Sequence, residues 1–257
     1  MPFKKQKGWG LWKPPFGADV NLGHPLAKNL TAFYLFNEGG GTLINDNVAG
    51  INNGAIQKLG ASTNTQWLPT PYGIGLKHDA TAANNGIKLN TAITSGTTFT
   101  FEVLFNWTLG SGSTYGNLLS HSASNGFWFK GNGGGGGGVT LTLSADHLNT
   151  TTLSANKWYH YVCSVNAGTA TFYINGKADG SVGSVTSLSL DGMLCDNNGT
   201  SGGEQFIGSV AYERFWIGRA LTANEVQQLY LNPFDMVVPQ RRRIISGAGG
   251  GSIASNI

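Results

Sequence analysis

Apolar and polar residues alternate through the middle of the chain, most regularly in residues 98–107 (TFTFEVLFNW). Every second side chain there is large and apolar, whereas Glu102 and most of the other polar residues fall on the opposite face. The apolar positions are Phe99, Phe101, Val103, Phe105 and Trp107. A period of two with one apolar face predicts an antiparallel strand that is buried on one side.

Similar runs predict many further strands. Residues 157–165 and 169–174 form a predicted hairpin, and the turn Asn175-Gly176 follows at once. Asn-Gly is the strongest short signal for a tight turn between two strands. The other predicted strands are residues 31–37, 73–78, 86–89, 116–121, 125–130, 139–144, 188–194 and 204–217. Strands this short and closely spaced predict a β-sandwich or a β-barrel.

The alternation also predicts a core between two packed sheets, whose inner faces lie about 10 Å apart. The expected members are Phe99, Phe101, Val103, Phe105, Tyr161, Cys163, Phe172 and Ile174. Two cysteines, Cys163 and Cys195, do not make a disulfide framework. Because Cys163 lies inside an apolar strand, we expect a buried thiol rather than a disulfide there.

One helix is predicted near the end of the patterned region. Residues 222–225 (TANE) have the spacing of a capping box, in which the threonine and glutamate side chains each bond the other residue's backbone amide. Val226, Leu229 and Tyr230 then fall on one face, and Pro233 ends the pattern. We therefore expect a single short helix that lies on a β body.

Residues 133–138 are six consecutive glycines between two predicted strands. Glycine has no side chain to pack and loses much conformational freedom when it is ordered, so we expect a loop. The run is not a phosphate-binding motif, because no Lys-Ser or Lys-Thr pair follows it and no helix begins there.

The two ends differ from the body, residues 30–232. Residues 1–29 are interpreted as an extended arm and residues 233–257 as an extended tail rich in Pro, Arg and Gly. Their large apolar residues, which would form a sticky patch in water, are Trp9, Trp12, Phe16, Phe234, Met236 and Val237. We expect both ends to contact other subunits, with Arg241, Arg242 and Arg243 meeting acidic groups. The alternative is that both ends fold back on their own domain.

Composition narrows the class of protein. Charged residues are 11% of the chain and glycines number 39, which excludes a coiled coil or a solvated helical bundle. The net charge of +3 comes mostly from the two ends, so we expect no nucleic-acid binding through the main domain. The sequence also lacks an apolar stretch long enough for a membrane-spanning helix and the apolar run of a secretory signal. We therefore expect neither membrane contact nor export by the general secretory route.

Three phrases resemble the laminin-G-like, concanavalin A-like lectin/glucanase domains. LTAFYLFNEGGGTLINDNVAGINNGAI is similar to the start of that family, KWYHYVCSVNAGTATFYINGK to its hairpin, and RALTANEVQQLYLNPF to its last helix. The resemblance implies an all-β fold, a two-sheet antiparallel jelly-roll sandwich with one short C-terminal helix. The chain departs from the family at Leu104, where a Trp is frequent, and in the strand AYERFWIGRAL, which looks one residue longer.

The fold of this family hosts enzymatic, binding and structural roles, so the resemblance does not decide the function. Glycosidases need two carboxyl groups, and retaining ones hold them about 5–5.5 Å apart. Glu102 is the lone carboxylate of its strand, and Glu204 and Glu213 have no acidic neighbour two residues away. We therefore expect no catalysis, and we interpret His160 as a packed or surface histidine.

The resemblance also suggests two binding sites. Some relatives hold Ca²⁺ in the loop that corresponds to Asp46, Asn52 and Asn53. The alternative is that Asp46 caps a turn. We expect no cofactor. A sugar site needs an exposed aromatic platform, and alternation makes Trp128, beside Phe127, the best outward-facing candidate. The alternative is that Trp128 meets a protein neighbour. The other tryptophans of the body are expected in the core: Trp67, Trp107, Trp158 and Trp216.

The function that we favour from the sequence is a non-enzymatic structural protein of a bacteriophage virion, such as a decoration, fibre or tail-associated subunit. The phrase that runs through residues 232–234 (NPF) into the tail is similar to versions found in phage structural proteins. This resemblance implies other virion proteins as partners, a homo-oligomer and a location in the particle. The alternative is a carbohydrate-binding module that attaches to a host or surface glycan. A glycan hydrolase is the third reading.

Overall fold

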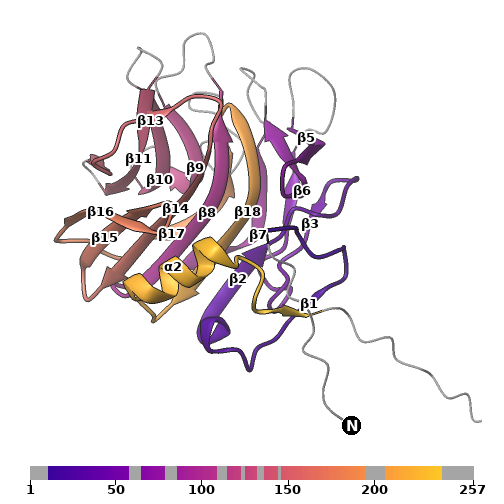
Figure 1. Ribbon diagram of the computed structural model, residues 1–257, viewed down its shortest axis with the longest axis horizontal. Helices are drawn as coiled ribbons and strands as arrows, with labels where there is room; N and C mark the ends of the chain where they lie inside the picture. Colours follow the sequence, from indigo (N-terminus) through magenta and orange to yellow (C-terminus); the bar gives the residue numbers. More distant parts are fainter. Residues whose placement is uncertain are drawn as a thin grey trace, which may run out of the picture.

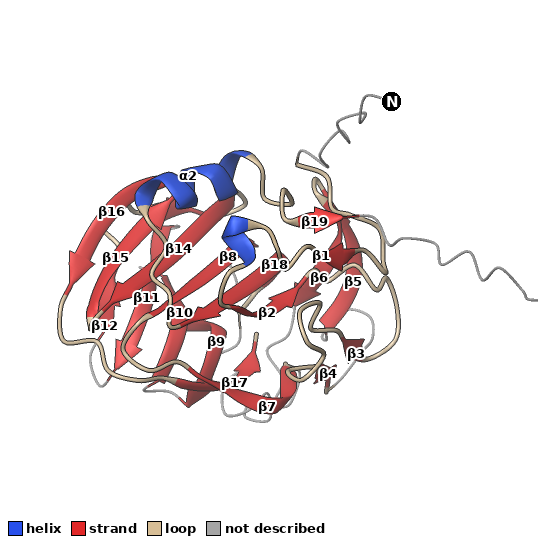
Figure 2. Cartoon of the chain, turned by 90° about the horizontal axis from the view of Figure 1, so that it is seen from below, coloured by secondary structure: helices blue, strands red, loops and turns tan. Residues whose placement is uncertain are grey.

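Two antiparallel β-sheets packed face to face make up most of the chain (Figure 1). The structure, a computed structural model, describes residues 11–57, 65–78, 86–108, 115–122, 125–131, 136–143, 146–194 and 206–238. Its architecture confirms the predicted all-β jelly-roll sandwich. The helices lie on the outer face of one sheet (Figure 2).

The eight-stranded sheet contains the strands that the alternation identified most clearly. At its centre β8 (Phe99–Trp107) lies between β14 (Trp158–Asn166) and β18 (Gly208–Ile217). Beyond β14 follow β15 (Thr169–Ile174) and β16 (Lys177–Val182). Beyond β18 follow β6 (Gly73–His78) and β5 (Thr65–Thr70), and β2 (Leu30–Tyr34) pairs with β18 as well.

The nine-stranded sheet faces it across the core. Its strands, in order across the sheet, are β12 (Asp146–Leu148), β11 (Gly136–Leu143), β10 (Asn125–Gly131), β9 (Tyr115–Ser122), β17 (Ser189–Met193), β7 (Ile87–Thr94), β4 (Gly54–Ile56) and β3 (Leu43–Ile44). In addition β13 (Leu153–Ser154) pairs with β11. Several of these strands are only two or three residues long, too short for alternation to identify.

The predicted inter-sheet core is confirmed for all eight of its expected members, which are buried in one apolar cluster. Register explains the grouping, since Tyr161 lies opposite Val103 and Cys163 opposite Phe101 on neighbouring strands. Across the core, the rings of Phe101 and Phe127 stack with their centroids 4.2 Å apart. Each large apolar side chain removed from water contributes roughly 1.5–3 kcal/mol. Cys163 is a free, buried thiol, as predicted.

The prediction of a loop at residues 133–138 is wrong for its second half. Residues 136–138 belong to β11, where Gly137 pairs with Leu153 on one side and Gly131 on the other. A Cβ at Gly137 would lie 2.4 Å from Cζ of Phe129. The missing side chain therefore lets the Phe129 ring lie against the strand. Residues 133–135 lie outside the described residues.

A second apolar cluster lies on the outer face of the eight-stranded sheet, where Figure 2 shows the helices. Its cover consists of α2 (Ala223–Leu231), the 3-10 helix η1 (Pro25–Ala27), and the pair β1 (Asp19–Val20) and β19 (Val237–Val238). The predicted capping box begins α2: Thr222 N–H donates to Glu225 Oε2 at 2.8 Å, and Glu225 N–H donates to Thr222 Oγ1 at 3.4 Å. None of the helices in the described ranges is long and apolar enough to span a membrane.

The described parts of the two ends fold back onto their own domain, which corrects the expectation of extended arms that contact other subunits. Phe234, Met236 and Val237 are buried in the second apolar cluster. Asn21 N–H donates to the Met236 carbonyl at 2.8 Å, and β1 pairs with β19, so each end holds the other. For these residues the structure shows the alternative reading.

Two side chains of β18 explain why the ends return. Arg214 donates from Nη2 to the Pro233 carbonyl, and its guanidinium lies 5.9 Å from the centre of the Phe234 ring. Trp216 donates from Nε1 to the Leu26 carbonyl at 2.8 Å. The chain's own sheet therefore supplies polar partners as well as apolar surface for both ends, and no second subunit is needed to remove them from water.

Other residues of the predicted arms are not buried in this way. Trp12 is 67% exposed and Phe16 is 65% exposed. For these two side chains, contact with another subunit stays a prediction. Trp9, Arg241, Arg242 and Arg243 lie outside the described residues.

Candidate functional site

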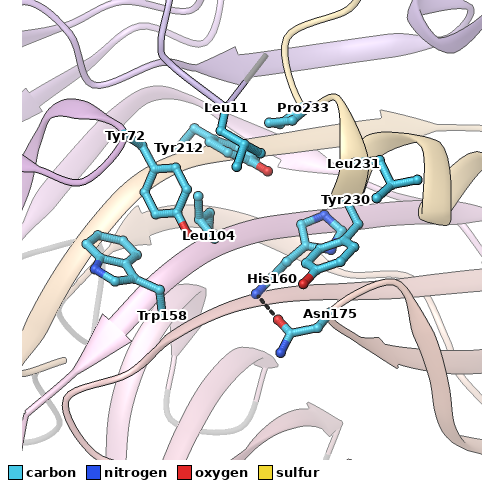
Figure 3. A pocket seen from close by; sticks show the side chains of 10 residues that line it. All are labelled: Leu11, Tyr72, Leu104, Trp158, His160, Asn175, Tyr212, Tyr230, Leu231 and Pro233. Carbon is cyan, nitrogen blue, oxygen red and sulfur yellow. Dashed lines mark hydrogen bonds between the residues drawn. The ribbon is translucent and has the colours of Figure 1, made fainter.

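A pocket of about 250 Å³ opens on the outer face of the eight-stranded sheet, beside the C-terminal end of α2 (Figure 3). β8, β14 and β18 form its floor, while α2, the β5–β6 and β15–β16 turns and the N-terminal segment form its walls. The residues that line it are Leu11, Tyr72, Leu104, Trp158, His160, Asn175, Tyr212, Tyr230, Leu231 and Pro233. Segments from both ends and the middle of the chain therefore meet at one site.

Aromatic side chains form two opposing walls of the pocket. Figure 3 shows Tyr72 and Trp158 on one side and Tyr230 on the other. The Tyr72 and Trp158 rings meet edge to face with centroids 5.3 Å apart, and both are half-buried. Tyr230 lies over His160 at a centroid distance of 5.7 Å and is 40% exposed. Val226 and Leu229, which the sequence places on the same helix face, are buried, whereas Tyr230 lies at the C-terminal end of α2 and lines the pocket.

The Asn175-Gly176 turn, predicted from the sequence, holds the third side of the pocket. Asn175 has a φ of 51°, and its Oδ1 accepts the backbone N–H of His160 at 3.0 Å (Figure 3). Gly176 has a φ of 78°, and a Cβ there would lie 3.0 Å from Cβ of Tyr230. Position 176 therefore requires glycine for two reasons: its backbone is left-handed, and α2 approaches too closely for a side chain.

Beneath the pocket lies a fully buried charged cluster centred on Glu102. Arg214 Nη1 donates to Glu102 Oε2 at 2.9 Å and to Oε1 at 3.1 Å. His160 Nε2 lies 2.9 Å from Oε1, and the Tyr212 hydroxyl donates to Oε1 at 3.2 Å. The alternation of β8, β14 and β18 puts all four side chains on the outer face, so cross-strand pairing brings them together.

These contacts determine the charge of Glu102. Burial opposes ionisation of the carboxyl, but Arg214 and His160 outweigh it, and the pKa of Glu102 is held below its ordinary value. Both carboxylate oxygens are already hydrogen-bonded, and the side chain is fully buried. Glu102 is therefore an ionised structural group with no proton to deliver and no oxygen free for a substrate.

Glu213 points to the opposite face of the sheet. It lies opposite Val103 on β8 and opposite Tyr34 on β2, within the inter-sheet core. Among the described residues its two buried oxygens have no hydrogen-bond partner, and burial raises its pKa well above the ordinary value. Because Glu102 and Glu213 lie on different faces, they do not form a pair around one substrate. Glu204 lies outside the described residues.

The expectation that Trp128 forms an exposed aromatic platform is wrong, because its side chain is buried. Phe127 and Phe129 are buried in the inter-sheet core, so alternation does turn Trp128 to the other face of the nine-stranded sheet. However, Trp128 is only 2% exposed, and no partner is found for its Nε1 in the part of the chain that the structure describes. Alternation fixes the face of a side chain, but it does not tell what covers that face.

Asp46 has the geometry of a turn cap, the alternative to a calcium ligand. Its Oδ1 accepts the backbone N–H groups of Phe33 at 3.1 Å and Val48 at 3.0 Å, and its Oδ2 accepts that of Asn52 at 3.4 Å. Its own N–H donates to Asn53 Oδ1 at 2.8 Å. In the described ranges, no group of three or more His, Cys, Asp or Glu side chains could hold a metal ion.

The pocket residues were mostly not identified from the sequence. Trp158 was expected in the core with Trp67, Trp107 and Trp216; Trp107 and Trp216 are buried, while Trp67 and Trp158 are half-buried. One signal was available: alternation puts Trp158 and His160 on the same face as Glu102, and the Asn175-Gly176 turn follows directly. His160 is indeed a packed histidine, and it lies at the edge of the pocket.

A sequence profile described as the concanavalin A-like lectin/glucanases superfamily matches residues 81–227, more than half of the chain. No curated protein matches the chain significantly. The matched region contains the three central strands of the eight-stranded sheet and the beginning of α2. It therefore includes the floor of the pocket.

Solved structures with a similar fold include domains from an arabinanase, a mosquitocidal protein and a sialidase. Domain 4 of AbnA, an extracellular arabinanase from Geobacillus stearothermophilus in complex with arabinotriose, is 17% identical, with a TM-score of 0.55 over 79% of this chain and 98% of that one. The binding domain of Paraclostridial Mosquitocidal Protein 1 is 17% identical, with a TM-score of 0.58 over 80% of this chain and 52% of that one. Trypanosoma rangeli sialidase is 14% identical, with a TM-score of 0.55 over 79% of this chain and 32% of that one. The chain thus spans about half of the second protein and a third of the third, and the likeness concerns the fold alone.

Proposed function

Because the chain belongs to the concanavalin A-like lectin/glucanase superfamily, we propose that it is a non-catalytic carbohydrate-binding domain whose sugar site is the pocket beside α2. The observation that carries the proposal is the pair of aromatic walls, Tyr72 with Trp158 on one side and Tyr230 on the other. Aromatic rings present flat apolar surface to the C–H faces of a sugar, and a few polar groups fix its orientation.

The polar groups of the pocket suit hydroxyl ligands. Oδ1 of Asn175 accepts the His160 backbone N–H, which leaves the amide nitrogen as the atom of this lining side chain that can donate to a ligand. The phenol hydroxyls of Tyr72 and Tyr230 both donate and accept. A small number of such groups within apolar walls is the usual composition of a ligand site.

The buried Glu102 supports the absence of catalysis. A glycosidase needs one carboxyl that carries a proton and a second that reaches the sugar. Glu102 is ionised, fully buried and bonded to Arg214, and Glu213 lies in the inter-sheet core. The fold is compatible with a binding domain, and its similarity to one arabinotriose-bound domain supplies a first ligand to test.

The role in a bacteriophage particle stays a prediction. It rests on the resemblance of the chain's last phrase and on the large apolar residues of the two ends, and so do the virion location, the virion partners and the homo-oligomer. A sugar-binding domain is consistent with attachment to a host or surface glycan, the alternative that the sequence suggested.

A glycan array followed by isothermal titration calorimetry tests the proposal, with arabinotriose as the first ligand. We expect at least one glycan to bind, and Tyr230→Ala to weaken it about tenfold or more, which corresponds to about 1.4 kcal/mol. Tyr230 is partly exposed, so the variant should unfold at nearly the same temperature as the original protein. Trp12→Ala is the matched control, because Trp12 is an exposed aromatic residue that does not line the pocket.

Leu104→Trp provides an independent test at the floor. Leu104 stands where the family often has a tryptophan, and the larger ring would fill the pocket from below. We expect the variant to lose binding while remaining folded. No new reducing ends should form when the original protein is incubated with its glycan. Failure of every glycan to bind, or full binding by Tyr230→Ala, would contradict the proposal.

A further inference from the structure

Resting on the proposed function, we propose that the pocket takes a single uncharged sugar residue at the end of a glycan chain. It does not accommodate an acidic sugar or the interior of a chain. Size, charge and hydrogen-bonding groups each support this assignment.

The size of the pocket favours one ring. Its volume of about 250 Å³ lies below the roughly 300–1,000 Å³ of pockets that hold drug-sized ligands. The walls come from different directions: Tyr72 and Trp158 face Tyr230 and Leu231, and Leu11 and Pro233 lie across from Asn175 (Figure 3). The interior of a glycan would need a groove open at two ends, whereas a chain end needs one opening.

The charge of the pocket favours a neutral ligand. None of its ten lining residues is Lys, Arg, Asp or Glu. The charges beneath the floor neutralise each other, since Glu102 and Arg214 form a fully buried ion pair. Lys13, whose backbone N–H donates to the carbonyl of Tyr72, donates from its side chain to the carbonyls of Phe36 and Ile74, and burial lowers its pKa to about 7. Within the described part of the chain, a sugar carboxylate would therefore lose its hydration without gaining a lysine or arginine partner, which is costly.

The hydrogen-bonding groups of the pocket match sugar hydroxyls. The Asn175 amide nitrogen donates, and the phenols of Tyr72 and Tyr230 donate or accept. Burial, and then the nearby Tyr230, raise the pKa of Tyr72, so its phenol keeps its proton. These groups suit a ligand that itself both donates and accepts without a formal charge.

Titration with matched ligands tests the inference. The probes are glucose against glucuronic acid, galactose against galacturonic acid, and arabinose against arabinotriose. We expect each neutral sugar that binds to do so about tenfold or more tightly than its acidic counterpart. We expect a monosaccharide to bind within about tenfold of its trisaccharide, because one ring makes most contacts.

A substitution that keeps the turn sharpens the test. Asn175→Asp retains the oxygen that accepts from His160 and tolerates the positive φ, but it removes the amide donor. We expect it to weaken neutral-sugar binding about fivefold. Asn21→Asp is the matched control: Asn21 also accepts a backbone N–H, that of Gly23, and it does not line the pocket.

The outcomes separate the inference from the proposed function. Equal or tighter binding of the acidic sugars, or binding of trisaccharides without detectable binding of any monosaccharide, overturns the inference but leaves a carbohydrate-binding domain. Binding by Asn175→Asp that equals that of Asn21→Asp also counts against it. If no sugar of any kind binds, the proposed function itself fails.

Discussion

Glu102 and Glu213 are equally buried glutamates on neighbouring strands, yet their surroundings differ completely. Glu102 faces outward from the eight-stranded sheet and contacts Arg214, His160 and Tyr212. Glu213 faces inward, where neither of its oxygens has a hydrogen-bond partner in the part of the chain that the structure describes. The pKa of Glu102 is lowered in spite of burial, because Arg214 and His160 favour its charged form, whereas burial alone raises the pKa of Glu213.

The difference shows what each face of the sheet can supply. The inner face packs against another sheet in an apolar cluster. Because a charge without partners is costly there, a carboxyl on this face keeps its proton. The outer face is covered by α2 and both chain ends, which bring carbonyls as well as apolar side chains. A charged pair can therefore be fully bonded there, and a pocket can form above it.

Arg214→Met should have the largest effect, because it leaves the charge of Glu102 buried without its cation. Removal of one partner of a buried ion pair typically costs about 3–5 kcal/mol. The Pro233 carbonyl would lose its partner as well. We expect a loss of this size in the free energy of unfolding, measured by urea denaturation.

The double variant Glu102→Gln with Arg214→Met is the control for that experiment. Glutamine carries no charge, so the double variant should recover part of the stability lost by Arg214→Met. A loss below about 1 kcal/mol for Arg214→Met would show that the pair contributes as little as an exposed one.

Glu213 should make the domain less stable as pH rises. The unfolded chain releases the proton near the ordinary pKa of 4.5, whereas the folded chain keeps it, because its pKa is raised well above that value. Above pH 4.5 the folded state therefore binds more protons than the unfolded state, and the free energy of unfolding falls by about 1.4 kcal/mol per pH unit until the folded-state pKa is reached.

Glu213→Gln isolates this contribution, since all other titrating groups remain. We expect urea denaturation to show a stability difference between variant and original that moves in favour of the variant as pH rises from about 4.5 to 7. A constant difference over that range would mean that Glu213 is ionised in the folded protein, in contradiction to its place in the core.

Thr222→Ala should have the smallest effect of the three. It removes the cap at the start of α2, where the hydroxyl accepts the Glu225 N–H, and such caps are worth about 1 kcal/mol. Thr222→Ser keeps a hydroxyl and should lose much less. If both variants unfolded alike, the outer cover would be held by Val226 and Leu229 rather than by its cap.

The central strands and the inter-sheet core could be predicted from the sequence because their signals are local. Alternation in residues 98–107 assigned Phe101 and Glu102 to opposite faces, and the structure has them there. The cap at Thr222 was equally local. The short strand β3 was missed, because two residues show no period.

The candidate site could not be predicted in the same way. Tyr72, Trp158 and Tyr230 are far apart in the chain, and Trp158 was expected in the core when considered alone. Trp128 had the expected face but not the expected exposure. Phe234 is buried on the domain beside Arg214, a contact that no local pattern reveals.

The sequence by itself determined which side chains point to which face of each strand, because neighbouring residues of a strand alternate by geometry alone. Only the tertiary structure decided what each face meets. Arg214 and Glu102 are 112 residues apart and come together through the pairing of β18 with β8. Cross-strand register and the return of both chain ends are long-range results of packing, and they determine which glutamate is ionised and where the pocket forms.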